Sequence, residues 1–207
     1  MSNIYIFPWL WATPNDFAHL DIGSYTLVAY SDWKKSDTIH SFSEKLCKQI
    51  PEHAILLWFS LGWILAIECA KKVSAKKVIL VSSIETKKDV PFSLKIISWI
   101  LPLFGKKFIT HGTNLLAKMN IISHEMAHLV YLRISAINWS FLIRSVRHIC
   151  SRKNTSTHHV FHIHGSNDTI FPIKKLHCIS NVVIANAGHF LLNQHGEEIS
   201  YMIKNNI

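Results

Sequence analysis

Glycine is scarce in this chain of 207 residues. The chain has 7 glycines, whereas average usage of about 7% would give about 14. It also has 7 tryptophans, and tryptophan is normally among the rarest residues. The two counts together equal the expected number of glycines, so the positions of the tryptophans become informative.

Cysteine is also infrequent, and its spacing excludes a Cys-x-x-Cys redox or zinc motif. The four cysteines are far apart in the sequence: Cys47, Cys69, Cys150 and Cys178. Such spacing is typical of reduced, packed thiols rather than a disulfide framework. The first residues, Met1–Tyr5, contain no basic region and no signal-peptide core. We therefore expect a cytoplasmic protein.

No apolar run is long enough to cross a membrane. The run from Ala54 ends at Glu68, and the segment 90–104 is interrupted by Lys95 and two prolines. Both are shorter than the roughly 20 residues that a spanning helix needs. We therefore expect no integral membrane span.

Acidic residues are outnumbered, with 13 Asp and Glu against 22 Lys and Arg and a formal charge of +9. The lysines occur in scattered pairs such as Lys34–Lys35 and Lys71–Lys72, without a run of five basic residues or interleaved aromatics. This distribution is typical of solvated helix ends and argues against a nucleic-acid partner. The 49% of hydrophobic and 17% of charged residues indicate a globular chain that can bury a sizeable core.

Short apolar runs alternate with helical patterns along most of the chain. The runs predict six strands, over 4–7, 26–30, 54–58, 78–81, 159–164 and 181–184. Helices are predicted at 37–50, after residue 60 to about 73, and at 195–205. Residues 85–157 instead contain broken apolar segments that look helical. The pattern predicts one α/β domain, 1–207, with a mainly parallel sheet and helices on both faces. Its core covers 1–84 and 158–207, and a helical cap insert covers about 85–157.

Ser60 lies between two apolar runs. The run Ile55–Phe59 precedes it, Gly62 follows two residues later, and a helical pattern begins. Strand, sharp turn and helix would expose the serine hydroxyl, as in the nucleophile elbow Gly-x-Ser-x-Gly. Trp58 occupies the place of the first glycine.

An aspartate and a histidine follow later strands in an informative order. Asp168 comes after the strand at 159–164, and His189 comes after the last strand. A serine hydroxyl needs an imidazole to take its proton, and the imidazole needs a carboxylate to fix its tautomer. Because the carboxyl ends of parallel strands meet at one edge of a sheet, we expect Ser60, Asp168 and His189 to form a catalytic triad.

The motifs around these residues resemble the α/β-hydrolase family. They read His-Gly-x-x-Asp-x-x-x-Pro over 164–172 and Gly-His-Phe over 188–190. Among family members the chain is most similar to small bacterial esterases, including the group of pimeloyl-carrier-protein methyl ester esterase. The resemblance implies a serine hydrolase that cleaves a carboxylic ester or thioester through an acyl-serine intermediate, without cofactor or metal. It also implies a small-molecule ester or acyl substrate, with an acyl-carrier substrate as one option. The oxyanion hole would use the backbone N–H groups of Leu10 and Leu61.

Four tryptophans stand where the family pattern usually has glycine: Trp9, Trp11, Trp58 and Trp63. With Phe59 they are expected to line the pocket. Two explanations remain open. Real tryptophans would fill the pocket and give a catalytically impaired, hydrolase-fold binding protein. Alternatively, the codon at these positions is UGA, which some bacteria decode as glycine and others as tryptophan.

A second motif predicts a different chemistry. His124-Glu125-Met126-Ala127-His128 fits the His-Glu-x-x-His helix of zinc hydrolases. Tyr131 and Ile134 stand where the metzincin extension has glycine and the third histidine. No glutamate occurs between Glu125 and Glu197 to serve as a ligand instead. A zinc-dependent hydrolase is therefore the remote alternative.

Overall fold

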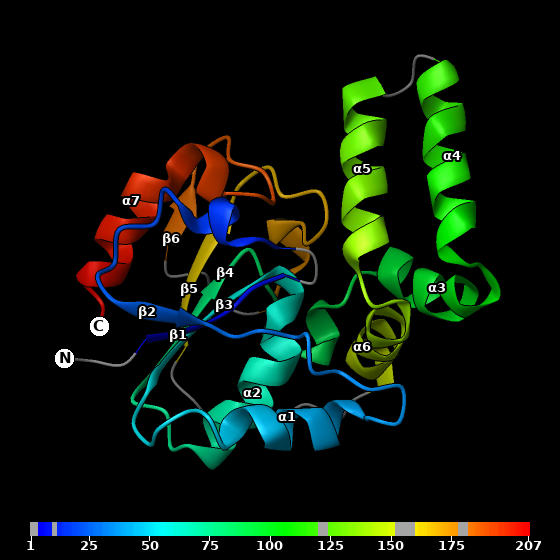
Figure 1. Ribbon diagram of the computed structural model, residues 1–207. Helices are drawn as coiled ribbons and strands as arrows, with labels where there is room; N and C mark the ends of the chain where they lie inside the picture. The colour runs from blue at the N-terminus through cyan, green and yellow to red at the C-terminus, as the bar shows by residue number, and fades with distance from the viewer. Residues whose placement is uncertain (1–3, 10–11, 120–123, 152–159, 178–181) are drawn as a thin grey trace.

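A computed structural model describes residues 4–9, 12–119, 124–151, 160–177 and 182–207. Six parallel strands form one sheet in the order β2-β1-β3-β4-β5-β6 (Figure 1). The strands are β1 (Ile4–Phe7), β2 (Tyr25–Leu27), β3 (Ile55–Phe59), β4 (Lys77–Val81), β5 (Val160–Gly165) and β6 (Val182–Ile184). The predicted parallel α/β fold is confirmed.

Seven α-helices and five short 3₁₀ helices lie in the described part of the chain. The α-helices are α1 (Ile39–Cys47), α2 (Trp63–Lys72), α3 (Phe92–Ile100), α4 (Lys106–Lys118), α5 (His124–Ala136), α6 (Trp139–Ser151) and α7 (Leu192–Lys204). The 3₁₀ helices are η1 (Pro14–Phe17), η2 (Ser60–Gly62), η3 (Lys87–Asp89), η4 (Leu101–Leu103) and η5 (Ile173–Lys175). No helix among the described residues is both long and apolar enough to span a bilayer.

The sheet has an apolar core on each face because successive side chains of a strand point to opposite sides. In β3, Leu56 and Trp58 pack with α1 and α2, whereas Leu57 and Phe59 pack with α7. All five residues of β3 are buried. This explains why the strand reads as a continuous apolar run, as expected for a parallel strand that is covered on both faces.

Two elements differ from the predicted bounds. The strand predicted at 26–30 ends at Leu27, and residues 28–31 instead line a cavity. The last helix starts at Leu192 rather than at 195 and contains a non-helical residue, His195 (φ −125°, ψ 23°). Gly196 follows, and a Cβ there would overlap the backbone of His19. The non-helical residue thus lies at the position where the sequence predicts the helix to begin.

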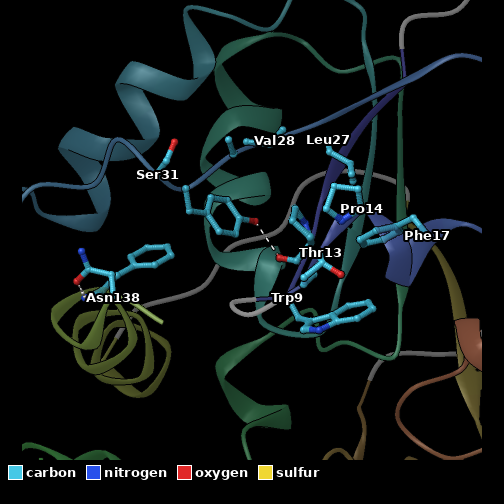
Figure 2. A pocket seen from close by; sticks show the side chains of 13 residues that line it. Trp9, Thr13, Pro14, Phe17, Leu27, Val28, Ser31 and Asn138 are labelled. Atoms are coloured by element: carbon cyan, nitrogen blue, oxygen red, sulfur yellow. Dashed lines mark hydrogen bonds between the residues drawn. The ribbon is translucent and has the colours of Figure 1, made fainter. Parts of the chain in front are cut away.

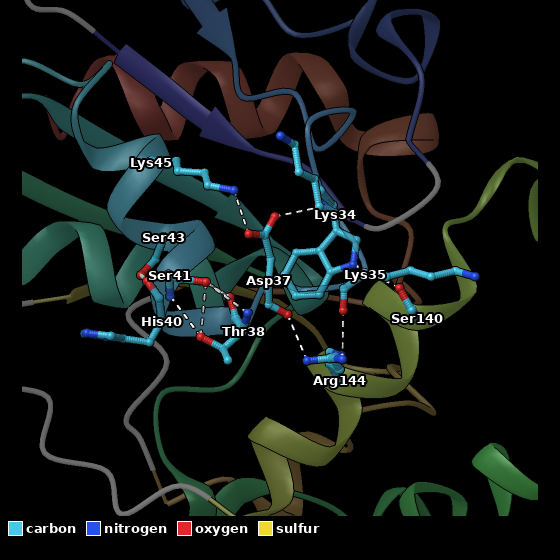
Figure 3. A network of polar contacts seen from close by, with 11 residues as sticks. Lys34, Lys35, Asp37, Thr38, His40, Ser41, Ser43, Lys45, Ser140 and Arg144 are labelled. Carbon is cyan, nitrogen blue, oxygen red and sulfur yellow. Dashed lines mark hydrogen bonds and ion pairs between the residues drawn. The ribbon is translucent and has the colours of Figure 1, made fainter.

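Helices α3 to α6 lie between β4 and β5 in the sequence and form a layer beside the sheet (Figure 1). Helix α6 joins this layer to the segment before α1 through a set of polar contacts (Figure 3). The Arg144 guanidinium donates to the carbonyl oxygens of Asp37 and Lys35, at 2.9 Å each. The Trp33 indole donates to Ser140 Oγ at 3.0 Å. A forked guanidinium on two carbonyls fixes direction as well as distance, so α6 is held in a defined position against the core.

Candidate active site

The turn after β3 has the geometry of a nucleophile elbow. Ser60 has φ +50°, in the left-handed region that residues other than glycine seldom adopt. A Cβ at Gly62 would overlap the backbone oxygens of Phe7 and Pro8. Only glycine therefore allows the start of α2 to approach the end of β1 this closely. The backbone of Leu61 follows Ser60 directly in η2, whereas Leu10 and Trp11 lie outside the described residues.

Two hydrogen bonds join the three residues predicted from the motifs. Ser60 Oγ lies 2.7 Å from His189 Nε2, and His189 Nδ1 lies 2.8 Å from Asp168 Oδ2. All three residues are buried. Because the carboxylate only accepts, His189 carries its proton on Nδ1 and its Nε2 accepts from the serine hydroxyl. This is the arrangement in which the imidazole can take the serine proton.

Asp168 is held by its own turn. Its Oδ1 accepts from the N–H groups of Ile170 and Phe171, at 2.8 Å each. A Cβ at Gly165 would overlap the carbonyl oxygen of Ala187, so this glycine lets the turn pack against the loop that carries His189. The glycine in the His-Gly-x-x-Asp motif thus brings the carboxylate within reach of the imidazole.

Three further buried side chains support the triad and were not predicted from the sequence. His164 Nε2 donates to the Phe171 carbonyl at 2.8 Å and lies 3.4 Å from Asp168 Oδ2. Its Nδ1 lies 3.1 Å from His162 Nε2. Ser83 Oγ donates to the Ser60 carbonyl at 2.6 Å. The motif that contains Asp168 already includes His164, so a signal for that residue was present. Ser83 comes from the end of β4, and no local pattern marks it.

The two histidines of β5 predict that acid destabilises the fold. Burial, with a smaller contribution from His164, lowers the pKa of His162 from 6.5 to about 3. Burial also lowers the pKa of His164. Below pH 6.5 the unfolded chain takes up a proton at His162, while the folded chain does not. The free energy of unfolding should therefore fall as the pH drops from 6.5 towards 3, by about 2 kcal/mol from His162 at about pH 5.

Urea unfolding at several pH values measures this effect. In a plot of the free energy of unfolding against pH, the acid limb is the decline between pH 6.5 and 3. His162→Gln should flatten this acid limb, because it removes the titrating group. The exposed His40 provides the control, and His40→Gln should leave that limb in place. An unchanged acid limb in the His162 variant would assign the effect to another group.

The described tryptophans at glycine positions lie in two different places. Trp9 packs against Phe17, Phe59 and Phe190, with ring centroids 5.3 to 6.1 Å apart. Trp58 and Trp63 lie in the core between the sheet and helices α1 and α2. Phe59 faces the opposite side of the sheet from Trp58. The residues expected together around one pocket are therefore divided between the two faces.

The indole N–H groups of Trp58 and Trp63 are buried without a hydrogen-bond partner among the described residues. Such a donor costs about 1–3 kcal/mol when it loses water and gains no acceptor. Trp58→Phe removes the unpaired donor but leaves a cavity where the larger ring was, so we expect the two effects to offset and the free energy of unfolding to change by less than about 1 kcal/mol. Urea unfolding measures the change.

Trp33→Phe is the matched control, because the buried Trp33 indole does have an acceptor in Ser140. This variant should lose about 1 kcal/mol. Equal destabilisation in the two variants would show that ring size, and not the unsatisfied donor, determines the effect.

A cavity of about 590 Å³ lies at the carboxyl ends of β1 and β2 (Figure 2). Its lining is mainly apolar: Pro8, Trp9, Ala12, Pro14, Phe17, Leu27, Val28, Ala29 and Phe141, with Thr13, Tyr30, Ser31 and Asn138 as polar members. The Tyr30 hydroxyl donates to the Pro8 carbonyl at 2.9 Å. Trp9 lines this cavity and also contacts Phe59 and Phe190, the neighbours of Ser60 and His189 in the chain.

The zinc motif lies on α5, in the cap. His124 and His128 are both exposed. Among the residues that the structure describes, no group of three or more His, Cys, Asp or Glu side chains could hold a metal ion. The described cysteines Cys47, Cys69 and Cys150 are free thiols, and Cys178 lies outside the described residues.

Comparison with known proteins gives matches in structure only. No family model and no curated protein sequence matches the chain. A hydrolase from Pseudomonas aeruginosa PA01 is similar over 99% of this chain and 89% of its own, with a TM-score of 0.72 and 11% identity. A thermophilic esterase from Thermogutta terrifontis matches over the same shares, with a TM-score of 0.69 and 13% identity. A putative lipase from Acinetobacter baumannii AYE matches over 99% of this chain and 83% of its own, with a TM-score of 0.64 and 13% identity. The sheet order, the elbow and these likenesses together show that the chain has the α/β-hydrolase fold.

Proposed function

We propose that the protein is a serine hydrolase that cleaves a carboxylic ester or thioester of a small or acyl-chain substrate. The observation that carries this proposal is the chain of two hydrogen bonds from Ser60 through His189 to Asp168, with Ser60 in a left-handed conformation. Packing does not require that polar side chains from three separate loops be buried together. Here they are also hydrogen-bonded in the order serine, histidine, carboxylate, which is the order that permits proton transfer. The esterase and the lipase among the structural matches support the same reaction class.

The reaction follows from the roles of these groups. Ser60 Oγ attacks the carbonyl carbon while its proton moves to His189 Nε2. The tetrahedral intermediate then expels the alcohol or thiol, which takes the proton from His189, and the acyl group stays on Ser60. Water repeats the sequence, with His189 as base and then acid, and releases the carboxylic acid. Asp168 keeps the imidazole in the productive tautomer and stabilises its charge.

The developing oxyanion needs hydrogen-bond donors. The N–H of Leu61 follows the nucleophile at the start of η2 and α2, where backbone N–H groups lack partners within the helix. We assign it as one donor and the N–H of Leu10, which follows β1 in the sequence, as the other. The mainly apolar cavity next to Trp9 would receive an apolar portion of the substrate, because burial of apolar surface favours such a group there.

A fluorophosphonate probe tests the proposal, because it forms a covalent adduct only with an activated serine. We expect labelling of the folded protein and an adduct on the peptide that contains Ser60. Labelling elsewhere, or none on folded protein, would contradict the proposal.

A hydrolase-fold binding protein is the second candidate, and the position of Trp9 favours it. We infer that the indole, which lines the cavity and packs against Phe59 and Phe190, limits access to the nucleophile. In this case a folded, unlabelled protein would still bind apolar ligands in the cavity. The measurement is the binding of a fluorescent fatty acid and its displacement by unlabelled acyl chains. It distinguishes a binding protein from a protein that is unfolded or binds no ligand.

The identity of the residue at positions 9, 11, 58 and 63 bears on both candidates. We propose glycine there in the source organism, on the basis of the motif positions and the two unsatisfied buried indoles. The intact mass of the native protein tests this, because each exchange removes an indolylmethyl group. A native mass equal to that of the printed sequence would exclude glycine.

A further inference from the structure

The cap carries an exposed apolar stripe on its outer side. Phe92, Ile96 and Trp99 of α3 and Leu103 of η4 follow one another at helical spacing. Phe92, Trp99 and Leu103 are 75%, 80% and 78% exposed. Single exposed apolar residues are common on protein surfaces, but a continuous stripe of this kind marks an interaction site.

Among the described residues, Phe92, Trp99 and Leu103 of the stripe belong to no buried apolar cluster. The opposite side of α3 faces α6, where Leu94 packs against the cluster of Ile137, Leu142 and Val146. Ser98, on that same side, is buried. Helix α3 is therefore apolar on both sides, and the fold uses only one of them.

Helix α4 carries exposed apolar side chains of its own. Phe108, Leu115 and Met119, at the spacing of one helix face, are all more than half exposed. The Phe108 ring stacks on Phe104, with centroids 4.0 Å apart. Helices α4 and α5 form a hairpin that projects from the α3 end of the cap, away from the sheet (Figure 1). Phe108, Leu115 and Met119 therefore lie on the projecting hairpin, whereas the stripe of α3 and η4 lies at its base.

The charge of the same segment has one sign. No Asp or Glu occurs between Asp89 and Glu125, whereas Lys95, Lys106, Lys107 and Lys118 do. Residues 85–157 hold 11 of the 22 Lys and Arg but 3 of the 13 Asp and Glu. Asp89 is buried and its carboxylate accepts from Thr86 and His177. Almost all of the net positive charge of the chain therefore belongs to the cap.

We propose that the outer side of α3, η4 and α4 docks on an anionic lipid surface. Aromatic and aliphatic side chains of an amphipathic helix enter the boundary between headgroups and acyl chains, while neighbouring lysines contact the phosphates. Trp99 suits this depth, since its ring is apolar and its N–H is polar. A second copy of the chain is a poorer occupant, because pairing of two such surfaces would bring their lysines together. Docking on lipid does not depend on catalysis and stands apart from the proposed reaction.

Sedimentation with vesicles tests the proposal. Vesicles of phosphatidylcholine with phosphatidylserine should bind the protein at least about tenfold more tightly than phosphatidylcholine alone, and added salt should weaken binding. Trp99→Ser combined with Leu103→Ser should reduce binding about tenfold or more, because it removes two of the most exposed apolar groups. The matched control is Tyr201→Ser, which removes an exposed aromatic side chain from α7. It should bind like the unchanged protein.

A second pair of variants tests the charge. Lys95→Glu with Lys107→Glu should abolish the preference for anionic vesicles, whereas Lys48→Glu with Lys174→Glu, which has the same net charge, should keep it. Circular dichroism confirms that each variant is folded.

Several results would overturn the proposal. The first is that the folded, unchanged protein does not sediment with anionic vesicles. The second is that it binds both vesicle types equally. The third is that the variant with Trp99→Ser and Leu103→Ser binds as tightly as the unchanged protein. A stable dimer that the Trp99 and Leu103 changes dissociate would assign the surface to a second copy instead.

Discussion

Replacement of Ser60 by alanine is expected to lower kcat for ester hydrolysis by a factor on the order of 10⁶, because the nucleophile of a triad acts as a unit with its base. The loss should appear in kcat rather than in KM, since the hydroxyl contributes to bond formation and not to the binding of the substrate. Fluorophosphonate labelling should disappear in the same variant. Hydrolysis of p-nitrophenyl esters of different chain lengths measures the first effect.

Ser82→Ala is a close control for this change. Ser82 is buried at the end of the neighbouring strand and has φ +46°, so the alanine meets the same kind of backbone strain as at position 60. The Ser82 variant should keep its activity. If the two variants lose activity to the same extent, damage to the sheet edge explains the loss, and Ser60 is not the nucleophile.

Replacement of Trp9 by glycine is expected to raise kcat/KM by about tenfold or more for esters with a bulky apolar acyl group, since each group that an apolar pocket newly accepts is worth about 1–3 kcal/mol. The indole borders the cavity of about 590 Å³ on the side of Phe59 and Phe190. Its removal would join that space to the nucleophile. A series of esters of increasing acyl length measures the gain, which should be larger for long chains than for acetate.

Trp9→Phe distinguishes access from a general change in the loop. It keeps an aromatic ring at the same place, so it should give little or none of the gain. A folded Trp9→Gly protein that hydrolyses no ester faster and reacts no faster with the fluorophosphonate probe would contradict this role for the indole and would favour the binding protein.

The proximity of the three residues of the proposed triad was predictable because each lies in a local motif that follows a strand. Ser60, Asp168 and His189 needed only the order of the motifs and the rule that parallel strands end at one edge. The bounds of β2 were less predictable, because Ala29 and Tyr30 continue the apolar run but line a cavity beyond the last backbone hydrogen bond to β1, from Val28 N to Ile6 O.

The positions of the tryptophans could have been refined from the sequence, at least within β3. Successive residues of a strand face opposite sides, so Trp58 and Phe59 could not both face the pocket. The contact of Ser83 with the Ser60 carbonyl and the approach of His164 to Asp168 depend on the register of neighbouring strands. No spacing within one segment contains that information.

The hairpin of α4 and α5 makes its main contacts within itself, whereas α6 is tied to the core by Arg144. The hairpin and α6 therefore depend to different degrees on contacts with the core. Insertions, deletions and substitutions in the hairpin can accumulate without disturbing Ser60, Asp168 or His189, while changes in α6 must preserve its fit to the segment before α1. Natural variants of this protein should accordingly diverge first in the hairpin, and an exchange of that unit between relatives offers a way to redirect the protein to a new surface.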